Sequence, residues 1–269
     1  QVNQANRITE PVRANPVVMI TGSTDGLGRE VARRMAATGA QVIVHGRNRE
    51  RGAALVEEIR KQGKGSATFY PADFASLAEV RKLGEAILRD YERIDVLVNN
   101  AGILGSKRTR AVSADGHELH FAVNYLSGFL LTRMLLPRLT KGPSRIVNIA
   151  SIAQQPIDFE DPQLERTYSD QRAYAQSKLA QVLFTMDLAK ELEGTGVTVV
   201  ALHPATMMNT TMVTAAGMQP RSTVDQGADA VMQAITSTEV KSGQYYIGLR
   251  LTQANAQAAA SPTRATTLP

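Results

Sequence analysis

The 269-residue sequence contains no cysteine. Disulfide bonds, thiolate metal ligands and a cysteine nucleophile are therefore excluded. Histidine is also scarce, with 4 residues in the chain, of which only His117 and His120 lie near each other. Because a metal site needs several clustered ligands, the sequence predicts no metal centre.

Long apolar runs and long charged runs are also missing. No segment reaches the ~18 apolar residues of a membrane span. The formal net charge of +5 is modest, and the basic residues form no block that would predict nucleic-acid binding. The chain begins at Gln1 instead of methionine, which leaves open whether a tag or a signal peptide was removed, and a cytoplasmic location is expected.

What the sequence does contain is a regular alternation of strand and helix patterns. Short apolar runs, typical of buried strands, alternate with segments whose apolar residues recur at helical spacing. Strands are expected at 16–22, 41–46, 66–73, 94–102, 145–151, 197–205 and 243–248. Helices are expected at 26–39, 49–62, 76–91, 117–139, 172–193 and 223–238.

This alternation predicts one α/β domain over residues 16–250, with a parallel sheet of about seven strands and helices on both faces. Polar residues 1–15 are expected to form an arm. Residues 251–269, rich in alanine, threonine and proline, are expected to form a fraying tail.

The first turn between a predicted strand and helix reads TGSTDGLG, from Thr21 to Gly28. A helix N-terminus carries free N–H groups and partial positive charge, which suit a diphosphate. Gly22, Gly26 and Gly28 would let the backbone approach such a group closely. The alternative is a tight turn that only packs the helix on the sheet. The place of the turn in the first strand–helix unit favours phosphate binding.

Tyr174 and Lys178 lie four residues apart, so they share one face of the predicted helix. A free tyrosine has a pKa of about 10, too high for a base at neutral pH. A nearby ammonium favours the phenolate and lowers that pKa, so the pair suits proton transfer. Tyr168 has Arg172 at the same spacing and is expected to be a loop aromatic or an edge of a substrate pocket.

Three motifs in order resemble the short-chain dehydrogenase/reductase family: the TGSTDGLG turn, NNAG at Asn99–Gly102, and Tyr174 with Lys178. The resemblance covers about residues 15–250 and is most similar to the retinol-dehydrogenase-like branch and its bacterial relatives. It implies a Rossmann-type doubly wound fold and hydride transfer between NAD(P) and a carbonyl or alcohol substrate. It also implies a substrate lid at about 206–218. A homodimer or homotetramer, formed through the long helices after the fourth and fifth strands, is implied as well.

The family pattern assigns the catalytic residues. Tyr174 exchanges a proton with the substrate oxygen while the nicotinamide exchanges hydride. Ser151, at the end of the fifth strand, donates a hydrogen bond to that oxygen. Lys178 holds the nicotinamide ribose, and Asn124 binds a water that connects Lys178 to solvent. The alternatives are a surface pair for Tyr174 and Lys178, a strand-end cap for Ser151 and a structural amide for Asn124.

The cofactor form is inferred from the residues after the second strand. The stretch VHGRNRER has no acid before Glu50, and Arg47 is placed for a 2′-phosphate, which favours NADP over NAD. The short basic stretch around Arg47 also fits a solvated helix start. Asp25 argues for NAD, since many NADP-using relatives carry a basic or neutral residue there.

The resemblance also implies a wider set of cofactor contacts. Asp73 with Phe74 matches the family's adenine-contacting pair, although Asp73 also suits a cap for the next helix. The expected cofactor contacts are Gly22, Ser23, Thr24, Asp25, Gly26, Leu27, Gly28, Arg47, Asp73, Phe74, Asn100, Ala101, Gly102, Tyr174, Lys178, Pro204 and Thr206.

The turn after the sixth strand departs from the family pattern, because Ala205 follows Pro204 where glycine is usual. Alanine adopts positive φ only at a cost, so the turn is expected to differ. The threonine that contacts the nicotinamide is then either Thr206 or Thr210. Four methionines follow and suit either a lipophilic alcohol, aldehyde or ketone or a packed amphipathic helix. They are Met207, Met208, Met212 and Met218.

Two other functions are weighed. A non-catalytic NADP-binding sensor on the same fold usually lacks the tyrosine or the lysine, and this chain keeps both. A sugar-nucleotide epimerase or dehydratase has a different glycine spacing and a longer C-terminal substrate domain. The expected partner is therefore a small-molecule substrate, with neither nucleic acid nor a membrane span.

Overall fold

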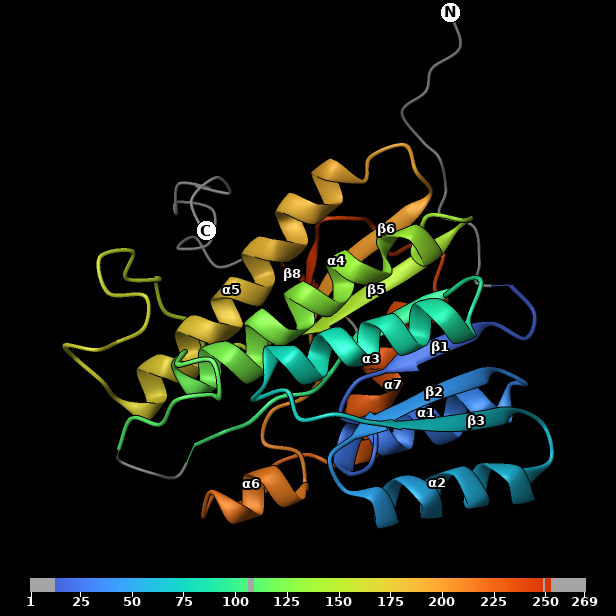
Figure 1. Cartoon of the computed structure of the whole chain (residues 1–269), viewed down its shortest axis with the longest axis horizontal. Helices are drawn as coiled ribbons and strands as arrows, with labels where there is room; N and C mark the ends of the chain where they lie inside the picture. The colour runs from blue at the N-terminus through green and yellow to red at the C-terminus, as the bar shows by residue number, and fades with distance from the viewer. Residues whose placement is uncertain (1–12, 106–108, 249, 253–269) are drawn as a thin grey trace, which may run out of the picture.

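The computed structural model describes residues 13–105, 109–248 and 250–252. Its centre is one sheet of 8 strands in the order β3-β2-β1-β4-β5-β6-β7-β8 (Figure 1). The strands are β1 Val17–Ile20, β2 Gln41–Gly46, β3 Ser66–Pro71, β4 Val96–Asn99, β5 Ser144–Ile149, β6 Val197–His203, β7 Tyr245–Ile247 and β8 Arg250–Thr252.

The expected set of seven parallel strands is confirmed, since β1 to β7 pair in parallel. The sheet has one further strand, because β8 pairs antiparallel with β7 at the edge. β8 crosses the predicted boundary between domain and tail at residue 250. A three-residue strand is too short to show a hydrophobic period, so β8 could not be predicted from the sequence.

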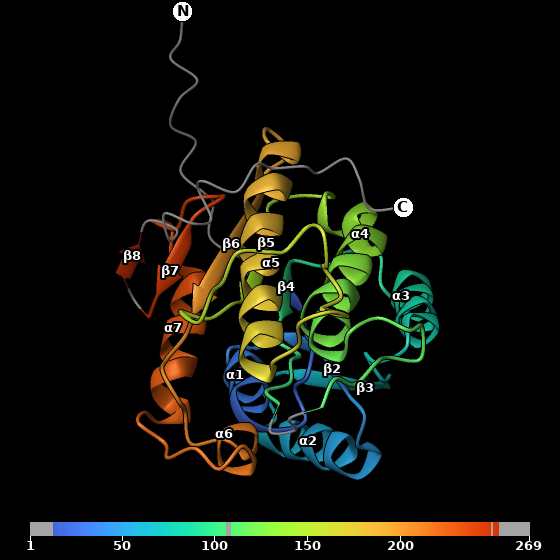
Figure 2. The same ribbon diagram turned by 90° about the vertical axis from the view of Figure 1, so that its left-hand side faces the viewer.

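Helices cover both faces of the sheet (Figures 1 and 2). Contacts with buried strand residues place α1, α2 and α7 on one face and α3, α4 and α5 on the other. The helices are α1 Gly26–Ala37, α2 Arg49–Gln62, α3 Leu77–Asp90, η1 Phe121–Leu126, α4 Ser127–Leu139, α5 Asp170–Glu191, α6 Thr211–Ala215 and α7 Val224–Thr236.

Strand β1 shows why the sheet is covered twice. All four of its residues are buried. Val18 and Ile20 pack in the core beneath α1 and α7, whereas Val17 and Met19 pack in the core beneath α3 and α4. Because successive strand residues point to opposite faces, a continuous apolar strand needs helices on both sides.

The strand order reverses at β1, whose neighbours are β2 and β4. In open parallel sheets, ligands bind outside the carboxyl ends of the strands at such a switch point. The turn after β1 and the NNAG segment after β4 therefore meet at this end of the sheet.

The long helix expected at 117–139 is the main difference in the helices. Residues Phe121–Leu126 form a π-helix, η1, before the regular helix α4 begins. The backbone N–H of Ser127 bonds to the carbonyl of Ala122, five residues earlier. Within the part of the chain that the structure describes, no helix is both long and apolar enough to cross a membrane.

Candidate active site

The glycine turn between β1 and α1 is packed directly on the NNAG segment. Gly22 and Gly26 have positive φ, +63° and +52°. A Cβ atom on Gly22 would lie 2.8 Å from the Cα atom of Ala101. On Gly28 it would lie 2.5 Å from both the carbonyl oxygen of Gly22 and Nδ2 of Asn100. Glycine is thus required at these positions by the backbone conformation and by the close approach of the two loops.

Hydrogen bonds hold the two loops together. Thr21 Oγ1 accepts from the backbone N–H groups of Asn100 and Ala101, both at 3.0 Å. The side-chain amide of Asn100 donates to the carbonyls of Thr21, at 2.8 Å, and Gly22, at 3.1 Å. Asn100 was predicted as a cofactor contact, and its side chain positions the turn. Thr21 was not singled out from the sequence, although it opens the motif.

His45 supports the same turn from below. Its ring is buried, Nδ1 accepts from the N–H of Gly22 at 3.1 Å, and Nε2 contacts the carbonyl of Ala72 at 3.2 Å. Burial lowers the pKa of His45 to about 4, so the neutral ring carries its proton on Nε2 and donates it to Ala72. The ring stacks on Phe74 at 4.3 Å. The side chain of Phe74 is thus part of the core, which leaves its backbone for the predicted adenine contact.

Basic side chains lie at the carboxyl end of β2. Arg47 is 69% exposed, and its guanidinium lies 3.9 Å from Asp73. Arg51 pairs with Asp25 at 2.9 Å. Asp25 also accepts from the N–H of Gly26 at 2.8 Å and caps α1. Arg51 thus compensates part of the negative charge of Asp25. This weakens the argument for NAD that the Asp25 carboxylate provided in the sequence.

Asn124 lies in η1 and fastens the loop after β4. Its Oδ1 accepts from the N–H of Ile103 at 2.7 Å, and its Nδ2 donates to the carbonyl of Ile103 at 3.1 Å and to Ser177 Oγ at 3.0 Å. A Cβ atom on Gly102 would lie 3.2 Å from Asn124 Oδ1 and 3.6 Å from Lys178 Nζ. The structure therefore brings Asn124, Gly102 and Lys178 together.

Tyr174, Ser151 and Lys178 form the centre of the site. The side chains of Tyr174 and Ser151 are hydrogen-bonded. Lys178 Nζ lies 5.7 Å from the centroid of the Tyr174 ring and donates to the carbonyl of Ile149 at 2.8 Å and to Gln181 Oε1 at 2.9 Å. The four residues predicted as catalytic are thus assembled from η1, the end of β5 and α5.

The pKa of Tyr174 differs from the expectation. Burial raises it, and the hydrogen bond with Ser151 only partly opposes this rise. Lys178 is itself buried, which lowers its pKa to about 7. The expected lowering of the Tyr174 pKa is therefore wrong as a net effect, because desolvation disfavours the charged forms of both residues.

A sequence model of the family described as short chain dehydrogenase matches residues 16–221. The chain belongs to this family. Retinol dehydrogenase 12 of Homo sapiens is 42% identical over 192 residues, which are 70% of this chain and 60% of that protein. Dehydrogenase/reductase SDR family member 13 of Bos taurus is 43% identical over 192 residues, 69% of this chain and 50% of that protein. The chain thus spans 60% or less of the length of these curated relatives.

Solved structures agree with the family. A protein from Mycobacterium paratuberculosis has a TM-score of 0.76 and 30% identity, covering 93% of this chain and 90% of that one. A short-chain dehydrogenase from Sphingobium yanoikuyae, solved in complex with NADPH, has a TM-score of 0.71 and 27% identity, covering 84% and 87%. The Rossmann-type fold and the membership in the retinol-dehydrogenase-like branch are confirmed.

The turn of this short-chain dehydrogenase after β6 was expected to differ from the family pattern because of Ala205. The positive φ of 47° falls on Met207 and not on Ala205. His203 Nε2 contacts Thr206 Oγ1 at 3.1 Å, and the carbonyl of Thr206 accepts from Ser222 Oγ at 2.6 Å. Thr206 is exposed.

Thr210 caps the short helix α6 and lies over the glycine turn, where a Cβ atom on Gly26 would be 3.1 Å from its methyl group. The structure therefore places Thr206 beside Pro204 and Thr210 beside the start of α1. The methionines also divide. Met208 packs against the core near Gly227, whereas Met212 and Met218 are exposed.

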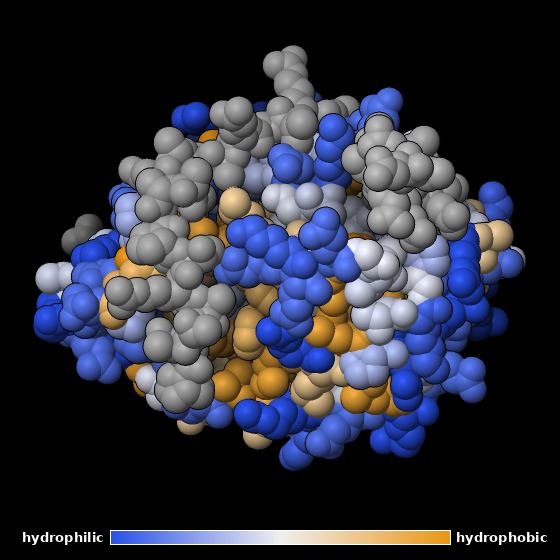
Figure 3. All heavy atoms as spheres, turned by 90° about the horizontal axis from the view of Figure 1, so that it is seen from above, coloured by the Kyte–Doolittle hydropathy of each residue, from blue (hydrophilic) through white to orange (hydrophobic). Residues whose placement is uncertain are grey.

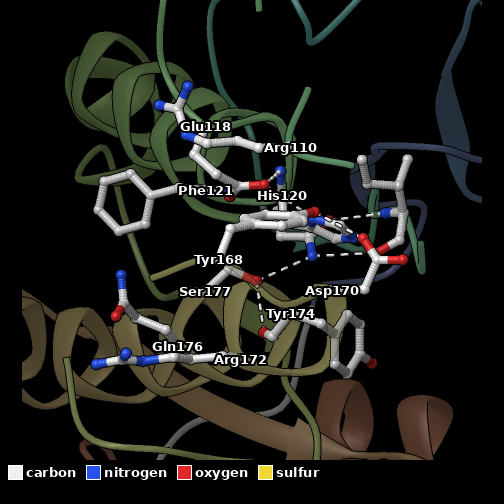
Figure 4. Close-up of polar contacts among 12 residues, drawn as sticks. Arg110, Glu118, His120, Phe121, Tyr168, Asp170, Arg172, Tyr174, Gln176 and Ser177 are labelled. Carbon is white, nitrogen blue, oxygen red and sulfur yellow. Dashed lines mark hydrogen bonds and ion pairs between the residues drawn. The ribbon is translucent and has the colours of Figure 1, made fainter. Parts of the chain in front are cut away.

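A second polar cluster, which the sequence did not predict, lies beside the residues predicted as catalytic (Figure 4). The Tyr168 hydroxyl donates to Asp170 Oδ1 at 2.6 Å. His120 Nδ1 contacts Glu118 Oε1 at 3.0 Å. A Cβ atom on Gly105 would lie 2.8 Å from both Asp170 Oδ1 and His120 Nε2, so glycine lets the two elements approach this loop.

The spacing of this cluster could have revealed it. His120 precedes Asn124 by four residues, and Asp170 precedes Tyr174 by four, so each member lies about one helical turn before a residue predicted to be catalytic. Burial and the bond to Asp170 raise the pKa of Tyr168 well above its usual value. Tyr168 is therefore a poor general base, in keeping with the expectation of a loop aromatic or an edge of a substrate pocket.

Proposed function

We propose that this protein is an NADP-dependent oxidoreductase that transfers hydride between the nicotinamide and a carbonyl or alcohol substrate. The observation that carries the proposal is the group of partly buried Tyr174 with buried Ser151 and Lys178, which contacts the glycine turn through Gly102 and Ala101. The residues proposed to transfer the proton and the turn proposed to bind the diphosphate therefore lie on either side of the segment Ala101–Gly102.

The residues at the turn fit a dinucleotide. The N-terminus of α1 and the glycines would hold the diphosphate, Asp73 and the backbone of Phe74 would hold the adenine, and Lys178 would hold the nicotinamide ribose. When bound, the nicotinamide would supply hydride to a carbonyl carbon or accept it from an alcohol carbon.

Side chains of the protein would transfer the proton to and from the substrate oxygen. In reduction the Tyr174 hydroxyl would donate its proton to the substrate oxygen, and in oxidation Tyr174 would take that proton back. Ser151 would donate a hydrogen bond to the same oxygen. Asn124 fixes the backbone at Ile103 beside Lys178, and a water at this place would connect Lys178 to solvent.

Arg47 supports NADP over NAD. Its side chain is exposed at the end of β2, and the carboxylate of Asp73 lies 3.9 Å away, so the guanidinium is available for a 2′-phosphate. Asp25, the opposing argument, is paired with Arg51. The NADPH complex of the related Sphingobium yanoikuyae protein is consistent with this preference.

A lipophilic substrate and a homo-oligomer complete the proposal. Ile152 and Phe159 on the loop after β5, and Met212 and Met218 around α6, are exposed apolar side chains. Relatives named retinol dehydrogenases support an apolar alcohol, aldehyde or ketone.

Phe129 of α4 packs on Phe184 of α5 at 5.0 Å, and the face in Figure 3 carries hydrophobic surface between hydrophilic side chains. A homodimer or homotetramer through these helices is testable by light scattering.

The test is fluorescence titration with NADPH and NADH, followed by a screen of apolar aldehydes and ketones, with Tyr174→Phe as the matched variant. We expect NADPH to bind more tightly, and Tyr174→Phe to bind it equally while turnover falls by roughly 10²–10⁴-fold. Binding without turnover on any carbonyl or alcohol would indicate the sensor instead. Failure to bind either nucleotide would refute the proposal.

A further inference from the structure

The Lys178 ammonium is buried among neutral groups. Its Nζ donates to the carbonyl of Ile149 at 2.8 Å and to the side-chain oxygen of Gln181 at 2.9 Å. Both Lys178 and Gln181 are 5% exposed. Because a lysine only donates hydrogen bonds, the amide of Gln181 must turn its oxygen toward Nζ.

Among the residues that the structure describes, the groups that face Lys178 carry no opposite charge. Tyr174 on α5 and His203 on β6 are the titratable neighbours, and Lys178 helps to lower the pKa of His203. Asn124 on η1 and Gly102 after β4 are uncharged. The pKa of Lys178 is low because the ammonium is buried and has lost its contact with water. The charged form therefore depends on neutral oxygen acceptors, which bind an ammonium more strongly than an amine.

We propose that Gln181 is a positioning residue that keeps Lys178 protonated and aimed at the Tyr174 ring. Two of the three ammonium protons are then held by Ile149 and Gln181, and the third is left for a ribose hydroxyl. The effect on catalysis rests on the proposed function. The effect on Lys178 itself does not.

The turn of α5 that carries Gln181 is anchored across the sheet. Thr185 Oγ1 donates to the carbonyl of Gln181 at 2.8 Å, and Asn148 Nδ2 donates to Thr185 Oγ1 at 2.8 Å. Asn99 Nδ2 then donates to Asn148 Oδ1 at 2.8 Å and to Thr132 Oγ1 at 2.9 Å. This buried series of side chains runs from α4 through β4 and β5 to α5 and fixes the backbone beneath Lys178.

The direct test is a pH titration of Lys178 in the cofactor-free protein, by NMR of isotope-labelled lysine side chains assigned with Lys178→Arg. Gln181→Met is close in shape but removes the acceptor, and we expect the midpoint of Lys178 to fall by about one pH unit. Gln181→Glu keeps an acceptor and adds negative charge, so the midpoint should rise above that of the unmodified protein. Equal midpoints in all three proteins would overturn the proposal.

Gln176→Met is the matched control. Gln176 lies on the same helix, is 1% exposed and bonds to the backbone of Pro162 at 2.7 Å and Asp158 at 3.2 Å, away from Lys178. We expect it to lower stability without moving the Lys178 midpoint. A shift as large as that of Gln181→Met would show a general effect of packing and overturn the proposal.

Catalysis provides the second readout. With less ammonium at Lys178, the Tyr174 phenolate is less favoured, so the acid limb of the pH profile for alcohol oxidation should move to higher pH in Gln181→Met. If the unmodified protein shows no turnover but the Lys178 midpoint still moves, the oxidoreductase proposal fails while the role of Gln181 stands. An unmoved acid limb in an active Gln181→Met enzyme would contradict the role in catalysis.

Discussion

The amino-terminal half of the domain, from β1 to α3, builds its part of the site from backbone, whereas the carboxyl-terminal half, from β4 to α7, builds its part from side chains. In the first half, glycine approaches its neighbours so closely that a Cβ atom on Gly28 would meet two of them at 2.5 Å. In the second half, titratable groups such as Lys178 are buried, with a pKa moved by desolvation. The first region should therefore be sensitive to added volume, and the second to changes of charge.

Each half contains a buried histidine whose pKa is lowered, His45 in the first and His203 in the second, which allows the charge sensitivity of the halves to be compared directly. Burial lowers the pKa of His45 in β2, and that of His203 in β6, from 6.5 to about 4. Below about pH 6.5 the unfolded chain binds protons that the folded chain does not, so stability is lost as the pH falls toward 4. We expect each histidine to remove up to about 1.4 kcal/mol of unfolding free energy per pH unit. Urea unfolding at a series of pH values measures this slope.

Single variants separate the two contributions. His45→Asn and His203→Asn should each make the slope between pH 6.5 and 4 less steep, whatever they do to stability at neutral pH. A slope that stays the same in His45→Asn alone would show that the amino-terminal half is not charge-sensitive, and would sharpen the contrast between the halves.

Added volume should affect the amino-terminal half most. Gly28→Ala forces a methyl group against Asn100 and the carbonyl of Gly22, so we expect a loss of about 1–3 kcal/mol in unfolding free energy together with weaker NADPH binding. Gly128→Ala in α4 is the control, since its Cβ atom would have its nearest contact at 3.5 Å. Equal losses in the two variants, measured by urea unfolding, would remove the proposed difference between the halves.

Arg47 is the exception in the amino-terminal half, because its proposed role depends on charge. Arg47→Ala should weaken NADPH binding by about 10–100-fold and leave NADH binding nearly unchanged, since only NADPH carries the 2′-phosphate. Arg49→Ala, which removes an exposed arginine at the start of α2, controls for general charge effects. Fluorescence titration would disprove the assignment if both variants lost NADPH affinity equally.

The smallest effect concerns backbone conformation after β6. Met207 has a φ of 47°, which costs a non-glycine residue free energy. Met207→Gly should raise the unfolding free energy by roughly 0.5 kcal/mol or less, because the more flexible unfolded chain offsets part of the gain. Ala205→Gly should lower it, since Ala205 is outside the positive-φ region. Thermal unfolding of the two variants should therefore shift in opposite directions.

Sequence patterns predicted the amino-terminal half more closely than the carboxyl-terminal half. The bounds of β2 and α2 match the expected 41–46 and 49–62. β2 is a continuous apolar run, and α2 combines a helical period with the N-cap Asn48. The four residues predicted as catalytic could be selected from the sequence because motif spacing fixes their order. The raised pKa of Tyr174 was missed, since the depth of burial cannot be read from spacing. The cluster of His120 and Asp170 was missed because it depends on how closely the loop at Gly105 approaches two helices.

The π-helical turn at Phe121–Leu126 was also not predicted. It changes which face of the helix the residues after it present. One α-helical residue turns the chain by about 100°, so the extra residue rotates everything after it by that amount. Asn124 faces the site, while Leu131, Leu135 and Leu139 after the turn face the core. Deleting one residue at Ala122 would restore a regular helix. Asn124 could then not bond to Ile103 while the three leucines stay in the core. A single-codon deletion there should therefore disable the site far more than a conservative substitution at the same position.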